Sequence, residues 1–434
     1  MAESAPRPWT WYLTPRPLFS GNNHVALLRG ATELLPALCA AIHGARHEVW
    51  LASYILHHDP QVLTVVQALE GAARRGVRVR IVVDGFGSKQ SMATLEPRLS
   101  AAGVAVGIFR PIDRWTHWFQ PSQLRRMHMK VAVIDSEEGF IGGINLIDDH
   151  LDLNHSPSHA PRLDFAVAVR GPVVASMEQA VRAMWLRAWF GQDWREELRE
   201  LMRGANRLQQ IQALIGQMRL TGWRRPSDGH LLAPVRAALV VRDNLRQRRT
   251  IERTYVEVLR SARQRIWLVS PYFFPGREFR KVICDAARRG VDVRLLLQGK
   301  LDYRLAGWAA KVLYDELLHA GVKIFEYTPA FLHAKVALVD DDWATVGSSN
   351  IDPLSLLLNL EANLIVSDTV FNARLAAELH LAHAASHPVN PAEQLTHHWL
   401  GRLRNGLGRA LVTWIASIYL RIAGAQPSRR KRSS

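Results

Sequence analysis

The amino-acid sequence predicts an α/β fold built from two tandem copies of one unit, each a mixed sheet flanked by helices, that together form one site. Two observations support this prediction. A histidine, a lysine, an apolar run, an aspartate, a glycine and an asparagine follow one another at residues 128–145 and, with identical intervals, at 333–350. Around both copies, amphipathic helical stretches alternate with apolar strand-like runs, which is typical of an α/β sheet.

The first unit becomes periodic at residue 23. We expect a helix over about 33–45, a strand over 49–54, a helix that ends at Gly76 and a strand over 77–84. Valine, isoleucine and leucine dominate the two strands, and they favour extended structure. A glycine directly after a helix suits the residue that follows a helical C-terminus.

The second unit repeats these sequence patterns. The pattern of residues 45–53 recurs at 262–270, and that of residues 72–77 recurs at 286–291. The difference in residue number between the copies decreases along the chain, as expected when loops differ in length. The chain is therefore interpreted as a tandem duplication. The predicted divisions are an N-terminal segment (1–22), a first domain (23–195), a helical linker (196–230), a second domain (231–385) and an amphipathic basic tail (386–434).

Each copy of the repeated pattern contains a candidate catalytic pair, His128 with Lys130 and His333 with Lys335. Alternation along a strand directs the histidine and the lysine to the same face. A neutral imidazole can attack phosphorus or take up a proton near neutral pH, and an ammonium group neutralises phosphate oxygens. One such pair alone would be weak grounds for catalysis, but two copies with the same downstream spacing favour it.

Four residues downstream of these pairs are candidate substrate-binding residues: Gly143, Asn145, Ser348 and Asn350. Glycine and serine allow the backbone to approach a ligand closely, and asparagine offers an amide donor.

Both copies resemble the signature of the phospholipase D superfamily, His-x-Lys-x4-Asp-x6-Gly-(Gly/Ser)-x-x-Asn. More narrowly, the chain resembles the bacterial cardiolipin synthases of the B type. This closer resemblance depends on Arg125-Arg126-Met127 before the first copy, on 343–350 and on 352–363, and the whole resemblance covers roughly residues 20–370. It implies a phosphatidyltransferase that moves a phosphatidyl group through a phosphohistidine to phosphatidylglycerol, giving cardiolipin, without a metal or another cofactor.

The resemblance also implies roles for the histidines. In family members the histidine of the N-terminal half is usually the nucleophile, so His128 is expected to attack and His333 to act as acid and base, although the two motifs are equivalent in sequence. Asp164 and Glu361 stand at corresponding places after the motifs and are expected to orient the histidines. The alternative for both carboxylates is a solvated charge at a strand end.

Two further aspartates, Asp135 and Asp340, belong to the catalytic motif of the family. Alternation from the histidine directs both to the opposite face of a regular strand. A structural role, such as binding turn backbone or bridging the halves, is therefore more plausible for them than contact with substrate. The acidic clusters 148–149 and 340–342 are expected to form turns rather than cation sites.

Composition limits the class of protein. Hydrophobic residues make up 48% and charged residues 22%, which is ordinary for a globular protein, so disorder is not the default. The net charge of +16 predicts attraction to a polyanion, and anionic lipid and nucleic acid satisfy it equally. Cys39 and Cys284 lie in predicted helices of different halves, so we expect buried thiols and a reducing compartment. No secretory signal or confident membrane span is recognised.

Three segments outside the repeats have two interpretations each. Residues 110–120 combine cations with three aromatic side chains, so they either cover the core or line an acyl-chain channel at the lipid surface. Residues 195–230 form a solvated linker or a lipid-facing element. Residues 400–423 and the basic run 429–432 form an interfacial helix and tail for anionic headgroups, or a packing helix with a solvated tail.

The leading functional hypothesis is therefore cardiolipin synthesis by a peripheral protein on the cytoplasmic side of the cell membrane. Its expected partners are phosphatidylglycerol and the membrane surface, with no nucleic acid. A hydrolytic phospholipase D, a nuclease of the same superfamily and a non-catalytic lipid-binding scaffold are the alternatives. The phosphatidyl donor and the oligomeric state are left open by the sequence.

Overall fold

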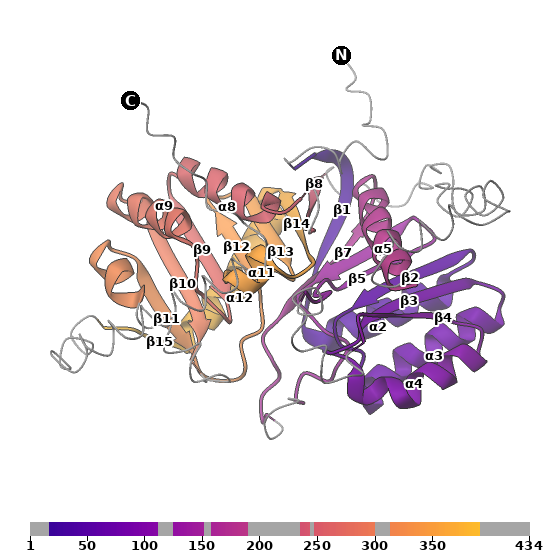
Figure 1. Ribbon diagram of the computed structural model, residues 1–434. Coiled ribbons are helices and arrows are strands. Elements are labelled where there is room, and N and C mark those ends of the chain that lie inside the picture. Colours follow the sequence, from indigo (N-terminus) through magenta and orange to yellow (C-terminus); the bar gives the residue numbers. More distant parts are fainter. Residues whose placement is uncertain are drawn as a thin grey trace, which may run out of the picture.

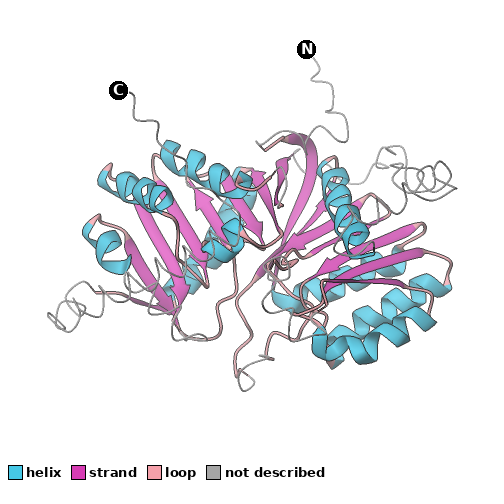
Figure 2. Ribbon diagram, viewed as in Figure 1, coloured by secondary structure: helices cyan, strands magenta, loops and turns pink. Residues whose placement is uncertain are grey.

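The fold was obtained as a computed structural model, which describes residues 17–111, 125–151, 158–189, 235–243, 247–299 and 313–390 (Figures 1 and 2). The first half contains β1 (Ser20–Arg29), α2 (Gly30–Gly44), β2 (Glu48–Ser53), α3 (Pro60–Arg74), β3 (Arg78–Asp84), α4 (Lys89–Ala101), β4 (Ala105–Phe109), β5 (Val131–Ile134), β6 (Glu138–Gly142), β7 (Phe165–Arg170) and α5 (Val173–Trp189). The second half contains β8 (Val235–Arg242), α8 (Thr250–Ser261), β9 (Arg265–Ser270), α9 (Arg277–Arg288), β10 (Asp292–Gln298), β11 (Lys323–Tyr327), β12 (Val336–Val339), β13 (Trp343–Gly347), α11 (Pro353–Leu357), β14 (Glu361–Ser367), α12 (Thr369–Ala384) and β15 (Ser386–Pro388).

All of these strands join in one sheet, in the order β15-β11-β10-β9-β12-β13-β14-β8-β1-β7-β6-β5-β2-β3-β4. Equivalent strands of the two halves follow one another in the same order from the centre of the sheet outward: β1-β7-β6-β5-β2-β3-β4 in the first half and β8-β14-β13-β12-β9-β10-β11 in the second. The two halves are therefore related by a pseudo-two-fold axis. Strands β2, β3 and β4 run parallel, and β2 pairs antiparallel with β5. The antiparallel pair of β1 and β8 joins the halves.

Helices cover both faces of the sheet (Figure 1). In the first half, α2, α3 and α4 pack on one face and α5 packs on the other; in the second half, α8 and α9 pack opposite α12. The core under α5 and α12 is a single cluster with residues from both halves, whereas the two outer helical layers have separate cores. The shared sheet and shared core hold the two halves in one arrangement.

Local signals explain where the helices start and stop. The Asp59 side chain accepts a hydrogen bond from the backbone N–H of Val62 at 3.0 Å, which caps the start of α3. Gly76 follows that helix with φ of 88°, a conformation that glycine adopts without strain. The equivalent Gly290, with φ of 90°, follows α9 in the same way.

The α/β class and the duplicated unit are confirmed. The predicted helix near 33–45 corresponds to α2, the strand near 49–54 to β2, and the strand near 77–84 to β3. Cys284 is buried on α9, but Cys39 on α2 is only half-buried, so the expectation of a buried thiol is wrong for that residue. The predicted linker, nearly all of the aromatic segment before His128, most of the N-terminal segment and the C-terminal tail from residue 391 lie outside the described residues.

Candidate active site

The two motif strands, β5 and β12, lie at equivalent inner positions of the sheet, and all of their residues are buried. The extended residues that precede β5 cross to the other half of the molecule. Met127 forms an isolated bridge with Leu360, and the His128 N–H donates to the carbonyl oxygen of Leu360 at 2.9 Å. The backbone around His128 is therefore held by the residue directly before Glu361.

The same crossing occurs in the opposite direction. Leu163 forms an isolated bridge with Leu332, and the His333 N–H donates to the Leu163 carbonyl oxygen at 2.9 Å. Leu163 directly precedes Asp164. The backbone of each motif histidine is thus hydrogen-bonded to the residue that directly precedes the carboxylate of the opposite half.

The imidazole rings continue this exchange between the halves. His128 Nδ1 lies 3.0 Å from Glu361 Oε2 and 3.1 Å from the carbonyl oxygen of Ser348. His333 Nδ1 lies 2.5 Å from Asp164 Oδ2. Both carboxylates are buried, at 0% exposure for Glu361 and 1% for Asp164. The structure therefore pairs each histidine with the carboxylate of the other repeat.

The two carboxylates differ in their electrostatics. Burial raises the pKa of Asp164 to about 7, although the charges of Lys335 and Lys130 and a backbone hydrogen bond oppose that shift. Burial acts on Glu361 in the same direction, but the attraction of His128 and a hydrogen bond from it outweigh burial, so the pKa of Glu361 lies below its ordinary value. At neutral pH Glu361 is ionised, whereas Asp164 is at the midpoint of its titration.

Both histidines are neutral in this environment. Burial lowers the pKa of His128, against the attraction of Glu361. Burial lowers the pKa of His333 further below its ordinary value, and the charges of Lys335 and Arg162 add to that shift. A neutral imidazole whose Nδ1 faces a carboxylate keeps its other nitrogen, Nε2, available for chemistry.

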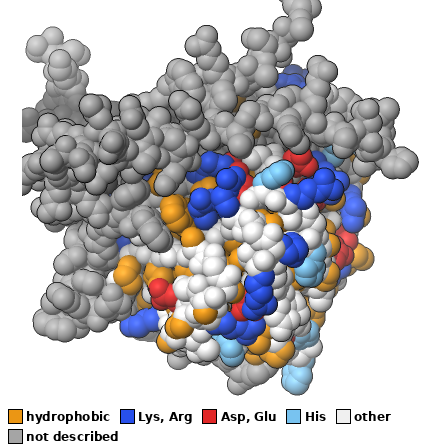
Figure 3. Space-filling model, turned by 90° about the vertical axis from the view of Figure 1, so that its right-hand side faces the viewer, with side chains coloured by type: hydrophobic (Ala, Val, Ile, Leu, Met, Phe, Trp, Pro, Cys, Tyr) orange, Lys and Arg blue, Asp and Glu red, His pale blue; other side chains and the backbone are white. Residues whose placement is uncertain are grey.

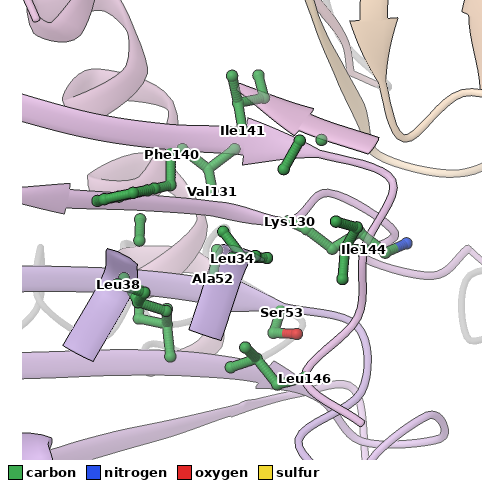
Figure 4. Close-up of a pocket in the computed structure, with 14 residues that line it drawn as sticks. Leu34, Leu38, Ala52, Ser53, Lys130, Val131, Phe140, Ile141, Ile144 and Leu146 are labelled. Carbon is green, nitrogen blue, oxygen red and sulfur yellow. The ribbon is translucent and has the colours of Figure 1, made fainter. Parts of the chain in front are cut away.

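The motif lysines also lie in buried positions. Burial and the charge of Lys335 lower the pKa of Lys130 to about 7, and burial lowers the pKa of Lys335 to about 8. Lys130 Nζ donates to the His128 carbonyl oxygen at 2.7 Å, and Lys335 Nζ donates to that of His333. The stem of Lys130 borders a small apolar cavity beneath α2, and its ammonium group points away from the apolar side chains (Figure 4). Two ammonium groups that repel one another favour a bound anion.

Gly143 and Ser348 contact protein groups in this structure, and their assignment to substrate binding stays a prediction. A Cβ atom on Gly143 would lie 2.3 Å from Asp164 Oδ1, because the carboxylate occupies the space that a side chain would need. The Ser348 side chain is fully buried, and its hydroxyl donates to Glu361 Oε2 at 2.5 Å. Both residues therefore act on the carboxylates that hold the histidines.

Asn145 and Asn350 lie in the loops that follow β6 and β13 and are 4% and 8% exposed. Among the described residues, the Oδ1 atom of each has no hydrogen-bond partner. A buried amide oxygen without a partner is costly and is satisfied when a hydroxyl or water reaches it. The Oδ1 atoms of these two side chains are suited to accept a hydrogen bond from an alcohol.

The motif aspartates lie at the other end of the motif strands, next to the starts of β2 and β9, so the structure does not bring them to the histidines. The carboxylate of Asp135 accepts hydrogen bonds from three successive backbone amides, 46 to 48, each at 2.8 Å. Asp340 binds the equivalent amides, 263 to 265, at 2.8 to 3.2 Å. This geometry agrees with the expected structural role and not with membership of the catalytic group.

Three further residues support the site and were not singled out from the sequence. Asp84, at the end of β3, accepts from the Met127 N–H at 2.9 Å and from Arg126 Nη1 at 3.2 Å, which positions the segment before His128. Its counterpart Gln298 accepts from the Leu332 N–H at 2.7 Å. The ring of Tyr54 lies edge-on to His128, with centroids 4.9 Å apart. In the sequence, the only signal for Asp84 and Gln298 is a polar residue at the end of a predicted strand, β3 in the first half and β10 in the second.

Within the described part of the chain, no group of three or more His, Cys, Asp or Glu side chains is arranged to hold a metal ion. No helix among those residues is both long and apolar enough to cross a bilayer. Asp149 and residues 340–342 lie in turns.

Two histidine and lysine pairs around one centre, each completed by a carboxylate of the opposite half, define an enzyme of the phospholipase D type. The family model described as "Cardiolipin synthase, PLD-like domain" matches residues 38–156 and 255–381. The chain belongs to this family of cardiolipin synthases with phospholipase D-like domains.

Individual relatives agree with this membership. The cardiolipin synthase B of Salmonella typhi is 36% identical over 362 residues, which cover 82% of this chain and 80% of that protein. The cardiolipin synthase B of Escherichia coli (strain K12) is 35% identical over 370 residues, with the same coverage of both chains. The crystal structure of a phosphatidylserine synthase from Haemophilus influenzae Rd KW20 has the same fold, with a TM-score of 0.63, 13% identity and coverage of 94% of this chain and 98% of that chain.

Proposed function

We propose that this enzyme makes cardiolipin, by transferring a phosphatidyl group from one phospholipid, through a covalent phosphohistidine, to a hydroxyl group of phosphatidylglycerol. The observation that supports this most directly is the pair of crossed dyads, His128 with Glu361 and His333 with Asp164. A two-step transfer needs one neutral nucleophile and one group that carries a proton. The two dyads differ in this respect, because Glu361 is ionised at neutral pH whereas the pKa of Asp164 is raised to about 7.

His128 is the proposed nucleophile. Its ring is neutral because burial lowers its pKa, and the ionised Glu361 accepts a hydrogen bond from Nδ1–H. The Nε2 lone pair attacks phosphorus, the N–P bond forms and the P–O bond to the leaving alcohol breaks. The positive charge that develops on the ring is stabilised by the carboxylate behind it.

His333 is the proposed proton carrier. With a pKa of about 7 on Asp164, the dyad takes up a proton as the pH falls through neutrality. It gives that proton to the departing alcohol in the first step. In the second step it accepts the proton of the incoming hydroxyl, which attacks phosphorus and releases His128. A proton affinity near the working pH serves both directions.

In this scheme the lysines hold the phosphate and the asparagines hold the alcohols. Lys130 and Lys335 neutralise the non-bridging oxygens, and a bound anion restores the protonated state that burial disfavours. The buried Oδ1 atoms of Asn145 and Asn350 accept from hydroxyl groups of the leaving and entering alcohols.

The substrates are phospholipids, with phosphatidylglycerol as the acceptor, and the protein is proposed to act as a peripheral protein on the cytoplasmic face of the membrane. The net charge of +16 favours an anionic lipid surface. The relatives named cardiolipin synthase B support synthesis over hydrolysis and over cleavage of nucleic acid.

One assay tests this function. Purified protein is incubated with vesicles of labelled phosphatidylglycerol, and the products are separated by thin-layer chromatography. Cardiolipin with glycerol is expected. Phosphatidic acid as the sole lipid product would show a hydrolase, and an absence of lipid turnover together with DNA cleavage would refute phosphatidyl transfer.

A further inference from the structure

Arginine side chains gather beside the His128 dyad, at a place that the chemistry above does not use. Three of them form what we call the arginine cluster: Arg125, Arg242 and Arg248. Arg125 lies three residues before His128, Arg242 ends β8, and Arg248 precedes α8. On the outer face of the first half, by contrast, Lys and Arg side chains are interspersed with hydrophobic and uncharged groups (Figure 3).

Hydrogen bonds connect the cluster to the reaction centre. The Asn359 side chain oxygen accepts from the Arg126 N–H at 3.4 Å, and the Asn359 carbonyl oxygen accepts from Arg242 Nη1. Asn359 stands two residues before Glu361, which holds His128. In addition, Arg242 pairs with Glu361 in the register of β8 and β14. The cluster therefore borders the nucleophilic side of the site.

The cluster concentrates positive charge. Arg242 is only 3% exposed; its burial, together with the charges of Arg125 and Arg248, lowers its pKa to about 10, even though Glu361 and Asp243 oppose that shift. Burial and the charge of Arg248 likewise lower the pKa of Arg125. Guanidinium groups held together in this way repel one another, and a bound anion would relieve that repulsion.

Carboxylates beside the cluster are engaged within the protein. Glu361 Oε2 accepts from His128 and from Ser348, whereas its Oε1 atom has no hydrogen-bond partner among the described residues. Asp84 accepts from Arg126 and from backbone amides, and Asp243 accepts from the Gln247 N–H. The Nε atom of Arg125 is buried and, among the described residues, has no hydrogen-bond partner. A phosphate oxygen is the kind of acceptor that such a group requires.

The cluster also breaks the pseudo-two-fold symmetry. By the offset that relates His128 to His333, the counterpart of Arg125 is Ala330. The counterpart of Arg242 is Gly30, whose N–H donates to the Asp164 carbonyl oxygen at 3.0 Å. Beside His333, the described residues include one such cation, Arg162, whose charge lowers the pKa values of His333 and Lys335. The larger number of arginines beside His128 indicates a second anionic group on that side.

The acceptor in cardiolipin synthesis has such a group. Phosphatidylglycerol attacks through a hydroxyl of its terminal glycerol, and its own phosphodiester remains one three-carbon bridge away from the reacting phosphorus. We propose that the arginine cluster binds the phosphodiester of the acceptor phospholipid while the reacting phosphate lies between His128 and His333. This proposal rests on the proposed function. Binding of the acceptor at the arginine cluster gives the enzyme a means to prefer a phospholipid over water or a simple alcohol.

A competition between two acceptors tests the proposal. Vesicles of labelled phosphatidylglycerol are incubated with enzyme and ethanol, and cardiolipin and phosphatidylethanol are measured together. Both products come from the same phosphohistidine, so their ratio is independent of the amount of folded enzyme. Arg125→Gln and Arg248→Ala are each expected to lower the ratio of cardiolipin to phosphatidylethanol about tenfold, the order of effect of one charge-assisted hydrogen bond.

Arg253→Ala is the matched control, because Arg253 is an exposed arginine on α8 and lies outside the cluster. Its ratio should equal that of the wild type. Arg248 is exposed, so its replacement is compatible with folding. If Arg125→Gln is inactive, the product ratio of Arg248→Ala tests the arginine site. An unchanged ratio in Arg248→Ala would overturn the arginine site. Failure of the proposed function would instead appear in the wild type, as an absence of cardiolipin without ethanol.

Discussion

Replacing Asp164 by asparagine should separate catalysis from stability in this enzyme. The substitution keeps the size of a buried side chain and removes the carboxylate that lies 2.5 Å from His333 Nδ1. An amide can hold the imidazole in the wrong tautomer, and it cannot exchange a proton with the ring. By analogy with triads in which the carboxylate is replaced by an amide, turnover should fall by roughly 10² to 10⁴-fold.

The free energy of unfolding should change in the opposite sense. The pKa of Asp164 is raised from 3.8 to about 7, so the folded state binds the proton more tightly than the unfolded state. The ionised carboxylate therefore destabilises the fold above pH 3.8, with the full effect present above about pH 7. At 1.36 kcal/mol per pKa unit, Asp164→Asn should be more stable by about 4 kcal/mol at pH 8 and by about 2 kcal/mol at pH 5, less whatever hydrogen-bond energy the amide loses.

Glu361→Gln is the matched variant with the opposite expected sign. The pKa of Glu361 lies below its ordinary value, so its ionised form stabilises the fold above the unfolded pKa of 4.5, and that stability is lost as the pH falls through the folded pKa. Glu361→Gln should therefore lower the melting temperature at pH 8 as well as turnover. Lipid turnover and thermal unfolding of both variants at pH 5 and pH 8 provide the measurement. A parallel loss of stability and activity in Asp164→Asn, or turnover within tenfold of the wild type, would refute the reasoning.

Three further predictions concern residues around the dyads. Ser348→Ala removes the hydroxyl that donates to Glu361, a charge-assisted bond of about 2 kcal/mol, so turnover should fall at least tenfold and Ser348→Thr should restore part of it; equal turnover in Ser348→Ala and wild type would contradict this role. Asp135→Ala leaves three backbone amides without their acceptor and should cost about 2 to 4 kcal/mol of unfolding free energy in denaturant titrations, whereas Asp135→Asn should cost less; a loss below about 1 kcal/mol would argue against the structural role. Sulfate, whose charge is constant from about pH 6 to 9, should bind more weakly in calorimetry as the pH rises through 7 to 8, because Lys130 and Lys335 lose their protons there; a pH-independent affinity would exclude these lysines as its ligands.

The sequence predicted the fold class and the position of the histidine and lysine pairs at the motif strands, because both depend on local pattern. The apolar runs after Lys130 and Lys335 have the composition of buried strands, and they form β5 and β12. Duplication added a second signal, since equal spacing in two copies is improbable unless both serve one site. For the same reason the carboxylates at 164 and 361 could be recognised as equivalent before any geometry was known.

The exchange of partners between the halves could not be predicted in this way. It depends on β1 pairing with β8 and on two short bridges, from Met127 to Leu360 and from Leu163 to Leu332, which are contacts between distant parts of the chain. Ser348 was assigned to substrate because a small residue in a loop allows close approach. In the fold, the group that approaches is Glu361, and no local pattern distinguishes a ligand from a neighbouring side chain.

The exchange of partners also affects the enzyme during its synthesis. His128 is made early, but the carboxylate and backbone carbonyl that hold it belong to residues 360 and 361. A nascent or truncated chain that ends before those residues contains a histidine with neither support, so it cannot form the phosphohistidine. The support of His128 is thereby coupled to synthesis of the chain through residue 361.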